Sequence, residues 1–445
     1  MAARVVLDEL KVRRGTPSLV APARATPRES VALSDIDNQP VMWFYSTVIH
    51  LYRGDPSKGL VDPAVAMRAA LAEALVHYYP LAGRLREEAG RRLVVDCAGQ
   101  GVMFLEADAD IAIDDLGDVR YPPFPRSEEF IYDDRVYRAP PHGVPLVLAA
   151  IINQPLLYVQ VTRLKCGGFT VCHQSAHCIS DAAGLAQFWK AVGELARGAR
   201  APSVPPVWAR EIFNARQQPL PSFPHDEYRE PADGCDGDRI ASTPPRDMAR
   251  VRFSFGPGAI AALRSRVAPG AASASRLMMA VNARGRRMDV FGREIPAGYY
   301  GNAFAFTVAR CAAGELCDRD LGYAVGLITA AKARVTYEYM RSVADMMVLE
   351  GRPVIARKRT FGVSDLSHAG FDKPVYSGVT MDAHRGATFF IRGKNEEGED
   401  ETFVGIYLPA DCMERYRKEV LALTTELEPH MEKASPAPLA LRARY

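Results

Sequence analysis

The sequence lacks the features that mark membrane-spanning and secreted proteins. It contains no apolar run near the roughly 20 residues that cross a bilayer, and its first residues lack the hydrophobic stretch of a signal peptide. Lysine and arginine number 55 against 53 acidic residues, a net charge of +2 that gives no reason to invoke nucleic acid or an anionic membrane. We therefore expect a cytoplasmic monomer that has neither nucleic acid nor a membrane as a partner.

The cysteines do not form a recognisable framework. There are eight, with no C-x-x-C pair among them, so reduced thiols are favoured over disulfides. His173 and His177 are four residues apart, but on a strand that spacing separates them by about 13 Å, too far for one ion. Gln174 also stands where a H-E-x-x-H zinc motif needs glutamate. We therefore expect no metal site.

Length and composition bound the architecture. A chain of 445 residues, 48% hydrophobic and 24% charged, is typical of soluble globular proteins and long enough for two domains. A proline-rich stretch disfavours long helices and strands in the middle of the chain. We predict an N-terminal domain at 1–197, a crossover linker at 198–248, a C-terminal domain at 249–430 and a flexible tail at 431–445.

One junction between a strand and a helix stands out. Residues 169–176 have the β-branched and apolar residues of a buried strand. The residues after it repeat at the spacing of one helix face: Leu185, Phe188, Trp189, Val192 and Leu195. His177 then ends a strand, where it can face a cavity and accept a proton near neutral pH. Asp181 opens a helix. Alternatively, His177 is a satisfied buried histidine and Asp181 only an N-cap.

Other elements follow from periodicity and from helix start and stop signals. Asp62-Pro63 predicts the start of a helix that runs over 65–79. A final amphipathic helix is predicted at 413–427. Strands are predicted at 92–96, 147–152, 157–164, 304–308, 387–391 and 403–408.

Ordered motifs give the sequence a family resemblance. Its segments Leu33–Asp37, Tyr78–Leu85 (YYPLAGRL), Cys166–Phe169, His177–Gly184, Pro206–Glu211, Val281–Arg286, Gly298–Asn302 and Val363–Asp365 occur in the order of the plant BAHD acyltransferases. These H-x-x-x-D enzymes move an acyl group from coenzyme A to an alcohol or amine. The stretch from Pro17 to Asp37 most resembles the branch that makes benzoyl and related esters of small alcohols.

The resemblance implies a fold and a reaction. The fold would be α/β, with two similar-sized domains of chloramphenicol-acetyltransferase-like topology and a solvent channel between them. Acyl-CoA would be a co-substrate, a small alcohol the acceptor, and no cofactor would be bound permanently. His177 would be the general base, with no acyl-enzyme. Asp181 would point away from His177 and pair with Arg284.

Other site residues are assigned alongside alternatives. Gly184 would allow a close approach of the helix to its neighbours, or is simply a small residue in a packed helix. Arg286 is a candidate contact for coenzyme A phosphates, because arginine forms bidentate phosphate contacts; a solvated face is the alternative. Tyr299 and Tyr300 match a tunnel-lining segment of the family, with core packing as the alternative.

Two departures from the family pattern leave other functions open. The D-F-G-W-G motif is missing, because Gly370-Phe371-Asp372 runs directly into Lys373. A strand and a helix that family members carry are also missing near 271–281. An inactive paralogue or gene-model variant is therefore one alternative. A hydroxycinnamoyl-CoA amine N-acyltransferase is another.

Overall fold

The computed structural model describes most of the chain. The described residues are 10–54, 61–116, 126–132, 151–230, 239–256, 275–284, 295–311, 315, 319, 321–366, 376–379, 383–384, 386–394 and 399–423. Statements about structure below refer to these residues.

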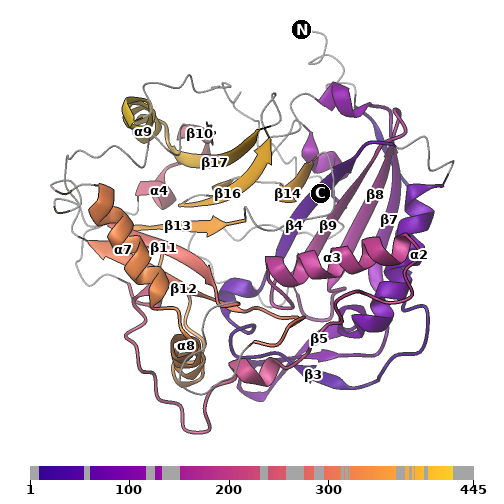
Figure 1. Cartoon of the computed structure of the whole chain (residues 1–445), viewed down its shortest axis with the longest axis horizontal. Helices are drawn as coiled ribbons and strands as arrows, with labels where there is room; N and C mark the ends of the chain where they lie inside the picture. Colours follow the sequence, from indigo (N-terminus) through magenta and orange to yellow (C-terminus); the bar gives the residue numbers. More distant parts are fainter. Residues whose placement is uncertain are drawn as a thin grey trace.

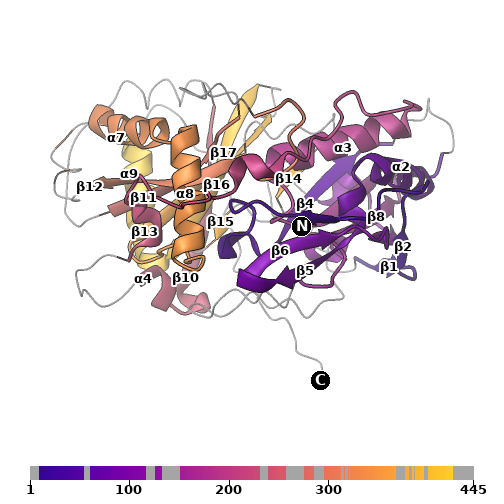
Figure 2. The ribbon, with the colours of Figure 1, turned by 90° about the horizontal axis from the view of Figure 1, so that it is seen from below.

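The described chain forms two halves side by side, each built around a mixed sheet (Figures 1 and 2). The first sheet has seven strands: β1 (Val12–Arg14), β7 (Val102–Ala109), β8 (Leu157–Leu164), β9 (Phe169–Ala176), β4 (Tyr45–Tyr52) and β14 (Tyr376–Val379) in order, with β2 (Ser18–Val20) also on β7. The second has β10 (Met248–Phe255), β17 (Asp400–Pro409), β16 (Ala387–Lys394), β13 (Thr360–Asp365), β11 (Ser275–Asn282) and β12 (Phe304–Cys311), with β15 (Ala383–His384) on β16. A small sheet holds β3 (Ser30–Ala32), β6 (Arg92–Asp96) and β5 (Arg84–Glu88).

The centre of the first sheet is a fully enclosed strand. β9 pairs with β8 on one side and β4 on the other, and all its residues after Phe169 are buried, which its apolar and β-branched side chains permit. Beyond β4 the sheet continues into β14, which comes from the second half of the sequence. The two halves therefore share a strand as well as an interface.

Two helices cover one face of this sheet. α2 (Pro63–His77) starts at Asp62, whose carboxylate accepts hydrogen bonds from the amides of Ala64 and Val65. α3 (Ala182–Ala196) packs beside it and crosses in front of the sheet (Figure 1). Phe188, Trp189 and Val192 of α3 are buried in the largest apolar cluster, as the helix periodicity predicts.

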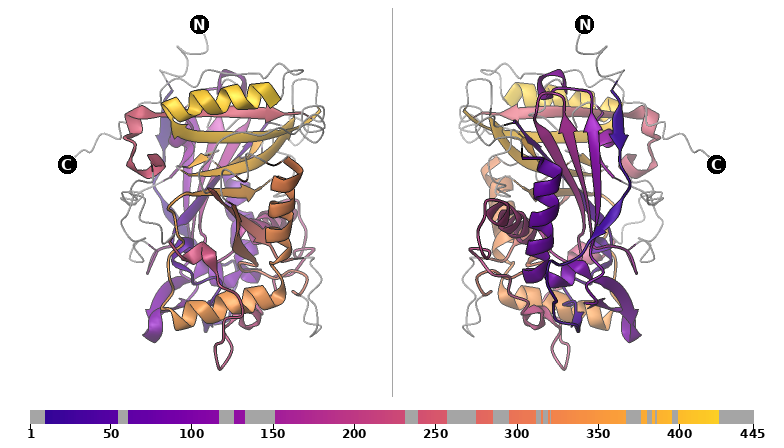
Figure 3. Two further views of the ribbon diagram at one scale, coloured as in Figure 1. Left: turned by 90° about the vertical axis from the view of Figure 1, so that its left-hand side faces the viewer. Right: turned by 90° about the vertical axis from the view of Figure 1, so that its right-hand side faces the viewer.

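Helices also cover the second sheet. α7 (Leu321–Ala333) and α8 (Tyr337–Leu349) pack near β12, where Met340, Val343 and Met347 are fully buried. α9 (Ala410–Leu423) lies along β10 and β17 (Figure 3). A short helix, α4 (Arg239–Ser242), precedes β10.

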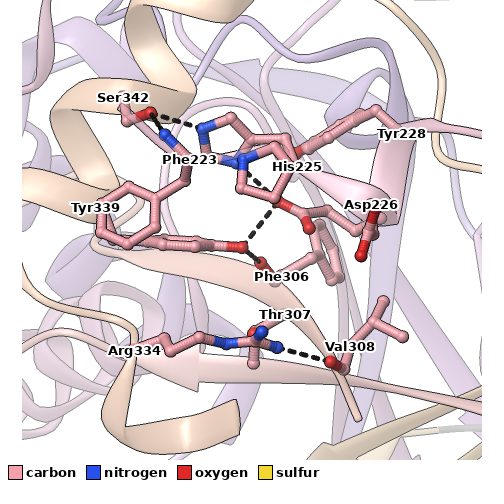
Figure 4. A network of polar contacts seen from close by, with 12 residues as sticks. Phe223, His225, Asp226, Tyr228, Phe306, Thr307, Val308, Arg334, Tyr339 and Ser342 are labelled. Carbon is pink, nitrogen blue, oxygen red and sulfur yellow. Dashed lines mark hydrogen bonds and ion pairs between the residues drawn. The ribbon is translucent and has the colours of Figure 1, made fainter. Parts of the chain in front are cut away.

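The segment that crosses between the halves is held by a buried polar network (Figure 4). The Oγ atom of Ser342 accepts hydrogen bonds from the amides of Ser222 at 2.9 Å and Phe223 at 3.1 Å. Both lone pairs are then used, so its proton points to Nε2 of His225 at 2.7 Å. The proton of the His225 ring is left on Nδ1, which lies 2.9 Å from Glu227. This network fixes the crossover segment to α8.

The two-domain α/β fold predicted from the sequence is confirmed. The predicted helix at 65–79 is α2 at Pro63–His77, and the final helix begins earlier than predicted, at Ala410. Within 198–230 and 239–247 the chain forms only helices of three or four residues. The strand predicted at 147–152 is not found in the part of it that is described, where Ile152 makes only an isolated bridge to Leu85. The predicted tail at 431–445 lies outside the described residues.

Candidate active site

His177 lies where the central strand of the first sheet ends. The β4–β9 register pairs Tyr45 with Ala176, so the next pair would be Phe44 and His177. The amide of His177 does donate to the carbonyl of Phe44 at 2.8 Å. Ile179 then turns back and donates to Ala176 at 3.0 Å, which ends the strand. The junction predicted from the sequence is confirmed, with β9 ending at Ala176 and α3 beginning after its N-cap, Asp181.

The imidazole of His177 has a buried edge. Its Nδ1 atom is buried with no hydrogen-bond partner among the described residues, while the residue as a whole is half-buried. Phe44 flanks the ring with centroids 5.0 Å apart, and Phe304 of β12 lies at 6.1 Å. Burial lowers the pKa of His177 below its ordinary value and outweighs the opposing effect of Asp181. The ring is therefore neutral at pH 7 and able to accept a proton.

Both carboxylate oxygens of Asp181 accept hydrogen bonds from groups other than the His177 ring. Its Oδ1 atom caps α3 by accepting from the amide of Gly184 at 3.0 Å. Its Oδ2 atom accepts from Arg284 at 2.5 Å and from the amide of Ala303 at 2.9 Å. Asp181 therefore joins α3 in the first half to the segment that leads into β12 in the second half.

Arg284 completes this junction. Besides Asp181, its guanidinium donates to the carbonyl of Gly301 at 2.9 Å and lies over the ring of Tyr299, with 5.6 Å to the ring centroid. These contacts occupy Arg284 with groups of the protein itself. Arg286 lies outside the described residues, so its predicted contact with coenzyme A phosphates stays a prediction.

Gly184 has no room for a side chain. A Cβ atom at this position would come within 2.9 Å of the Cβ of Ser180 and 3.6 Å of the ring of Tyr300. The first turn of α3 therefore sits closer to its surroundings than any larger residue allows.

The pairing of Asp181 with Arg284 predicts energetic coupling between them. We expect Asp181→Ala and Arg284→Ala each to lower thermal stability and activity. We expect the double variant to lose less than the sum, with a coupling energy of about 0.5–3 kcal/mol. Melting temperatures and turnover of the four proteins measure the cycle. Strictly additive losses would contradict the pairing.

A second network, which the sequence did not reveal, holds the turn that carries His177. Its centre is the carboxylate of Asp37, which is 0% exposed. Asp37 accepts from Arg210 at 2.5 Å and from the side chain of Asn302 at 2.9 Å. Asn302 also donates to the carbonyl of His177 at 2.9 Å, and Arg210 donates to that of Ile179 at 2.8 Å. The network therefore fixes both ends of the turn after β9.

The sequence marks each of these residues as part of a family-like segment, but it does not show that they contact one another. Asp37, Arg210 and Asn302 all lie in segments that match the family pattern, at 33–37, 206–211 and 298–302. Nothing in the local pattern shows that they meet, because 173 residues separate Asp37 from Arg210 and 265 separate it from Asn302. Only the fold brings them to His177.

Tyr299 and Tyr300 are both buried. Tyr299 is 2% exposed and packs edge-on against Phe213 in the core of the second half. Tyr300 is 0% exposed and packs against Tyr78 and Trp208 in the core of the first half. Their burial favours the core-packing alternative over a role in lining a tunnel.

Among the residues that the structure describes, no thiolate nucleophile is placed beside His177. Cys178 is fully buried, and burial raises the pKa of its thiol, so the sulfur stays protonated. His173 lies on β9 with its Nε2 atom 3.1 Å from that of His50. Within the described part of the chain, no group of three or more histidine, cysteine or acidic side chains is arranged to hold a metal ion. The helices described there also include none long and apolar enough to cross a membrane.

The chain matches a known protein family and is similar to known proteins. A model of the Transferase family matches residues 10–252 and 260–423. Benzyl alcohol O-benzoyltransferase of Petunia hybrida is 45% identical over an alignment 445 residues long. The alignment covers 92% of this chain and 93% of the relative.

Two solved structures resemble the fold. The crystal structure of vinorine synthase has a TM-score of 0.66 and 19% identity, covering 93% of this chain and 98% of that one. That of F. graminearum TRI101 complexed with coenzyme A and T-2 mycotoxin has a TM-score of 0.66 and 14% identity, covering 88% and 97%. At these identities the two structures show the shared two-domain fold.

Proposed function

Because the chain belongs to the Transferase family, the BAHD acyltransferase family that its motifs resemble, we propose that it transfers an acyl group from coenzyme A to a small alcohol with His177 as the general base. The observation that carries this proposal is the half-buried His177 ring, neutral at the end of β9, with its backbone held by hydrogen bonds to Phe44 and Asn302. The Petunia relative, named for benzoyl transfer to benzyl alcohol, supports an alcohol as acceptor and benzoyl as the acyl group. Acetyl is the second proposed acyl group.

The proposed reaction is a direct transfer in a ternary complex. As the acceptor oxygen attacks the thioester carbonyl, its proton passes to Nε2 of His177. The tetrahedral intermediate then collapses, the C–S bond breaks, and the same proton goes to the departing sulfur of coenzyme A. His177 returns to its neutral form, so one residue serves as base and then as acid.

The surroundings of His177 support the absence of an acyl-enzyme. A covalent route needs an activated nucleophile within reach of a base. Cys178 is adjacent in sequence, but its thiol is buried and its pKa is raised, so it is a poor nucleophile. As the family resemblance implies, acyl-CoA is proposed as a co-substrate, with no permanently bound cofactor. Arg286 stays a proposed contact for its phosphates.

The two alternatives are not favoured. The Petunia relative is named for an alcohol acceptor, which argues against an amine acceptor. For the inactive alternative, the residues around His177 are complete, with Asp181 paired to Arg284 and Asp37 joined to Asn302. β11, which lies in the region of the apparent excision near 271–281, also pairs along its full length with β12. The position of the missing D-F-G-W-G motif lies outside the described residues.

Release of free thiol from acyl-CoA tests the function. We expect purified protein to release coenzyme A from acetyl-CoA or benzoyl-CoA only when an alcohol is present, with one ester formed for each thiol. Amines of similar size serve as the matched comparison. Ester formation would support the proposal; amide formation in preference to ester, or no product with any donor, would overturn it.

The cellular setting is part of the same proposal. We propose that the enzyme acts as a monomer in the cytoplasm. The six cysteines among the described residues are all free thiols, which agrees with a reducing compartment.

A further inference from the structure

The side chain of Asn302 lies against the backbone of His177. Its Nδ2 atom donates to the carbonyl of His177 at 2.9 Å, while its Oδ1 atom is buried. The Nδ1 atom of the His177 ring is buried as well, and neither Oδ1 nor Nδ1 has a hydrogen-bond partner of good geometry among the described residues. Because buried polar atoms are nearly always paired, each of these two atoms is a candidate partner for the other.

The orientation of the Asn302 amide is fixed by Asp37. The two hydrogens of Nδ2 go to Oδ1 of Asp37 at 2.9 Å and to the carbonyl of His177 at 2.9 Å. Both partners are acceptors, so the nitrogen and the oxygen of the amide cannot be exchanged. The backbone amide of Asn302 donates to the same oxygen of Asp37 at 2.8 Å. The oxygen of the Asn302 side chain is therefore left to accept a hydrogen bond.

A count of donors and acceptors shows which nitrogen of the His177 ring carries the proton. A neutral imidazole has one N–H donor and one acceptor nitrogen. With the proton on Nε2, the buried Nδ1 atom would need a donor, but both hydrogens of the Asn302 amide are already used and the described residues supply no other. With the proton on Nδ1, the oxygen of Asn302 can accept it. The lone pair of the ring then lies on Nε2.

The electrostatics of His177 agree with this count. Burial has the largest effect on its pKa and lowers it. The charges of Asp181 and Asp37 raise that pKa, as do hydrogen bonding to the carbonyl of His177 itself and to the side chain of Asn302. A hydrogen bond raises the pKa of a histidine when the ring donates, because it then favours the protonated form. The Asn302 side chain therefore acts on the ring as an acceptor.

We propose that Asn302 is a positioning residue that sets the tautomer of His177, with its Oδ1 atom accepting the proton of Nδ1 so that Nε2 keeps the lone pair. Asp37 in turn holds Asn302, while Asp181 is engaged by Arg284. An amide thus takes the part that a carboxylate plays toward histidine in a catalytic triad. This rests on the proposed function and adds to it the group that orients the base.

Nitrogen-15 NMR of protein labelled at histidine tests the tautomer, because a ring nitrogen that carries hydrogen differs in chemical shift from one that does not. The chain has nine histidines, and the signals lost in His177→Ala are those of His177. We expect the wild-type protein at pH 7 to carry the hydrogen of His177 on Nδ1. A hydrogen on Nε2 would overturn the proposal, whether or not any variant at Asn302 folds.

Asn302→Leu removes the amide but keeps a side chain of similar size. We expect His177 to lose its single tautomer and kcat to fall by about 10- to 10²-fold, the loss typical of removing the partner that orients a functional histidine. The affinity for acetyl-CoA should change little. The acidic limb of kcat/KM should move to lower pH, because a contact that raises the pKa of His177 is lost while Asp37 and Asp181 remain.

Arg210→Ala is the matched control. It loosens the same turn by removing the donor to the carbonyl of Ile179, but it leaves both acceptors of the Asn302 amide in place. Its stability should fall, yet the hydrogen should stay on Nδ1 of His177 and the acidic limb should not move to lower pH.

Two results with these variants would overturn the proposal. One is the same change of tautomer in Asn302→Leu and Arg210→Ala, which would tie the tautomer to the integrity of the turn. The other is an Asn302→Leu protein with the tautomer and kcat of the wild type. A wild-type protein with the hydrogen on Nδ1 that releases no coenzyme A with any donor and alcohol would instead refute the proposed function and leave the tautomer assignment standing.

Discussion

Replacing His177 with alanine is expected to lower turnover by about 10²- to 10⁴-fold, the range that a general base contributes. The affinity for acyl-CoA should change little, because the lost group acts on the acceptor's proton. Thiol release gives the turnover, and calorimetry with acetyl-CoA gives the affinity. The backbone of the turn should persist, since its hydrogen bonds to Phe44 and Asn302 use main-chain atoms of His177.

His77→Ala provides a matched control for this variant. His77 ends α2 and takes no part in the networks around His177. It should keep wild-type turnover even if stability falls. Near-normal turnover of a well-folded His177→Ala protein would remove His177 from the chemistry.

Replacing Arg210 with alanine should give the largest loss of stability, about 3–5 kcal/mol. The reason is that Asp37, which is 0% exposed, would be left buried without its cationic partner. For domains of this size the loss corresponds to a melting temperature lower by roughly 6–20 °C. Activity should fall as well, because the carbonyl of Ile179 loses its donor in the turn after His177. A thermal melt of the purified variant measures the effect.

Arg24→Ala is the matched control, because Arg24 forms an ion pair with Glu73 in which both side chains are exposed. Such surface pairs contribute about 0–1 kcal/mol, so its melt should stay close to that of the wild-type protein. If Arg210→Ala melted like Arg24→Ala, the Asp37 network would not hold the site together. A double variant, Asp37→Asn with Arg210→Met, should lose less than the two single changes combined.

The local features of the site could be predicted because their causes are local. A run of β-branched and apolar residues at 169–176, followed by helical spacing from Leu185 onward, placed His177 and Asp181 correctly at a junction. Asp62 and Pro63 likewise marked the start of α2. In each case neighbouring residues determine the backbone, so the pattern carries the information.

Long-range features of the site could not be predicted in this way. Asp37 meets Asn302 and Arg210 only after two sheets have assembled, and no periodicity records such a contact. β14 shows the same limit, because nothing in the sequence at 376–379 says that these residues will join the first sheet beside β4. The rings beside His177 depend on both effects, since Phe44 follows from the β4–β9 register and Phe304 reaches His177 across the interface between the halves.

The pH dependence of kcat/KM tests the central claim most directly, because it reports the pKa of the base in the free enzyme. Burial lowers the pKa of His177, so the neutral, active form persists to lower pH than an exposed histidine would allow. We predict that activity falls on the acidic side with an inflection below about 6.5, the ordinary value for histidine. That limb should vanish from the residual activity of His177→Ala. The same acidic limb in wild-type protein and in His177→Ala would contradict the account.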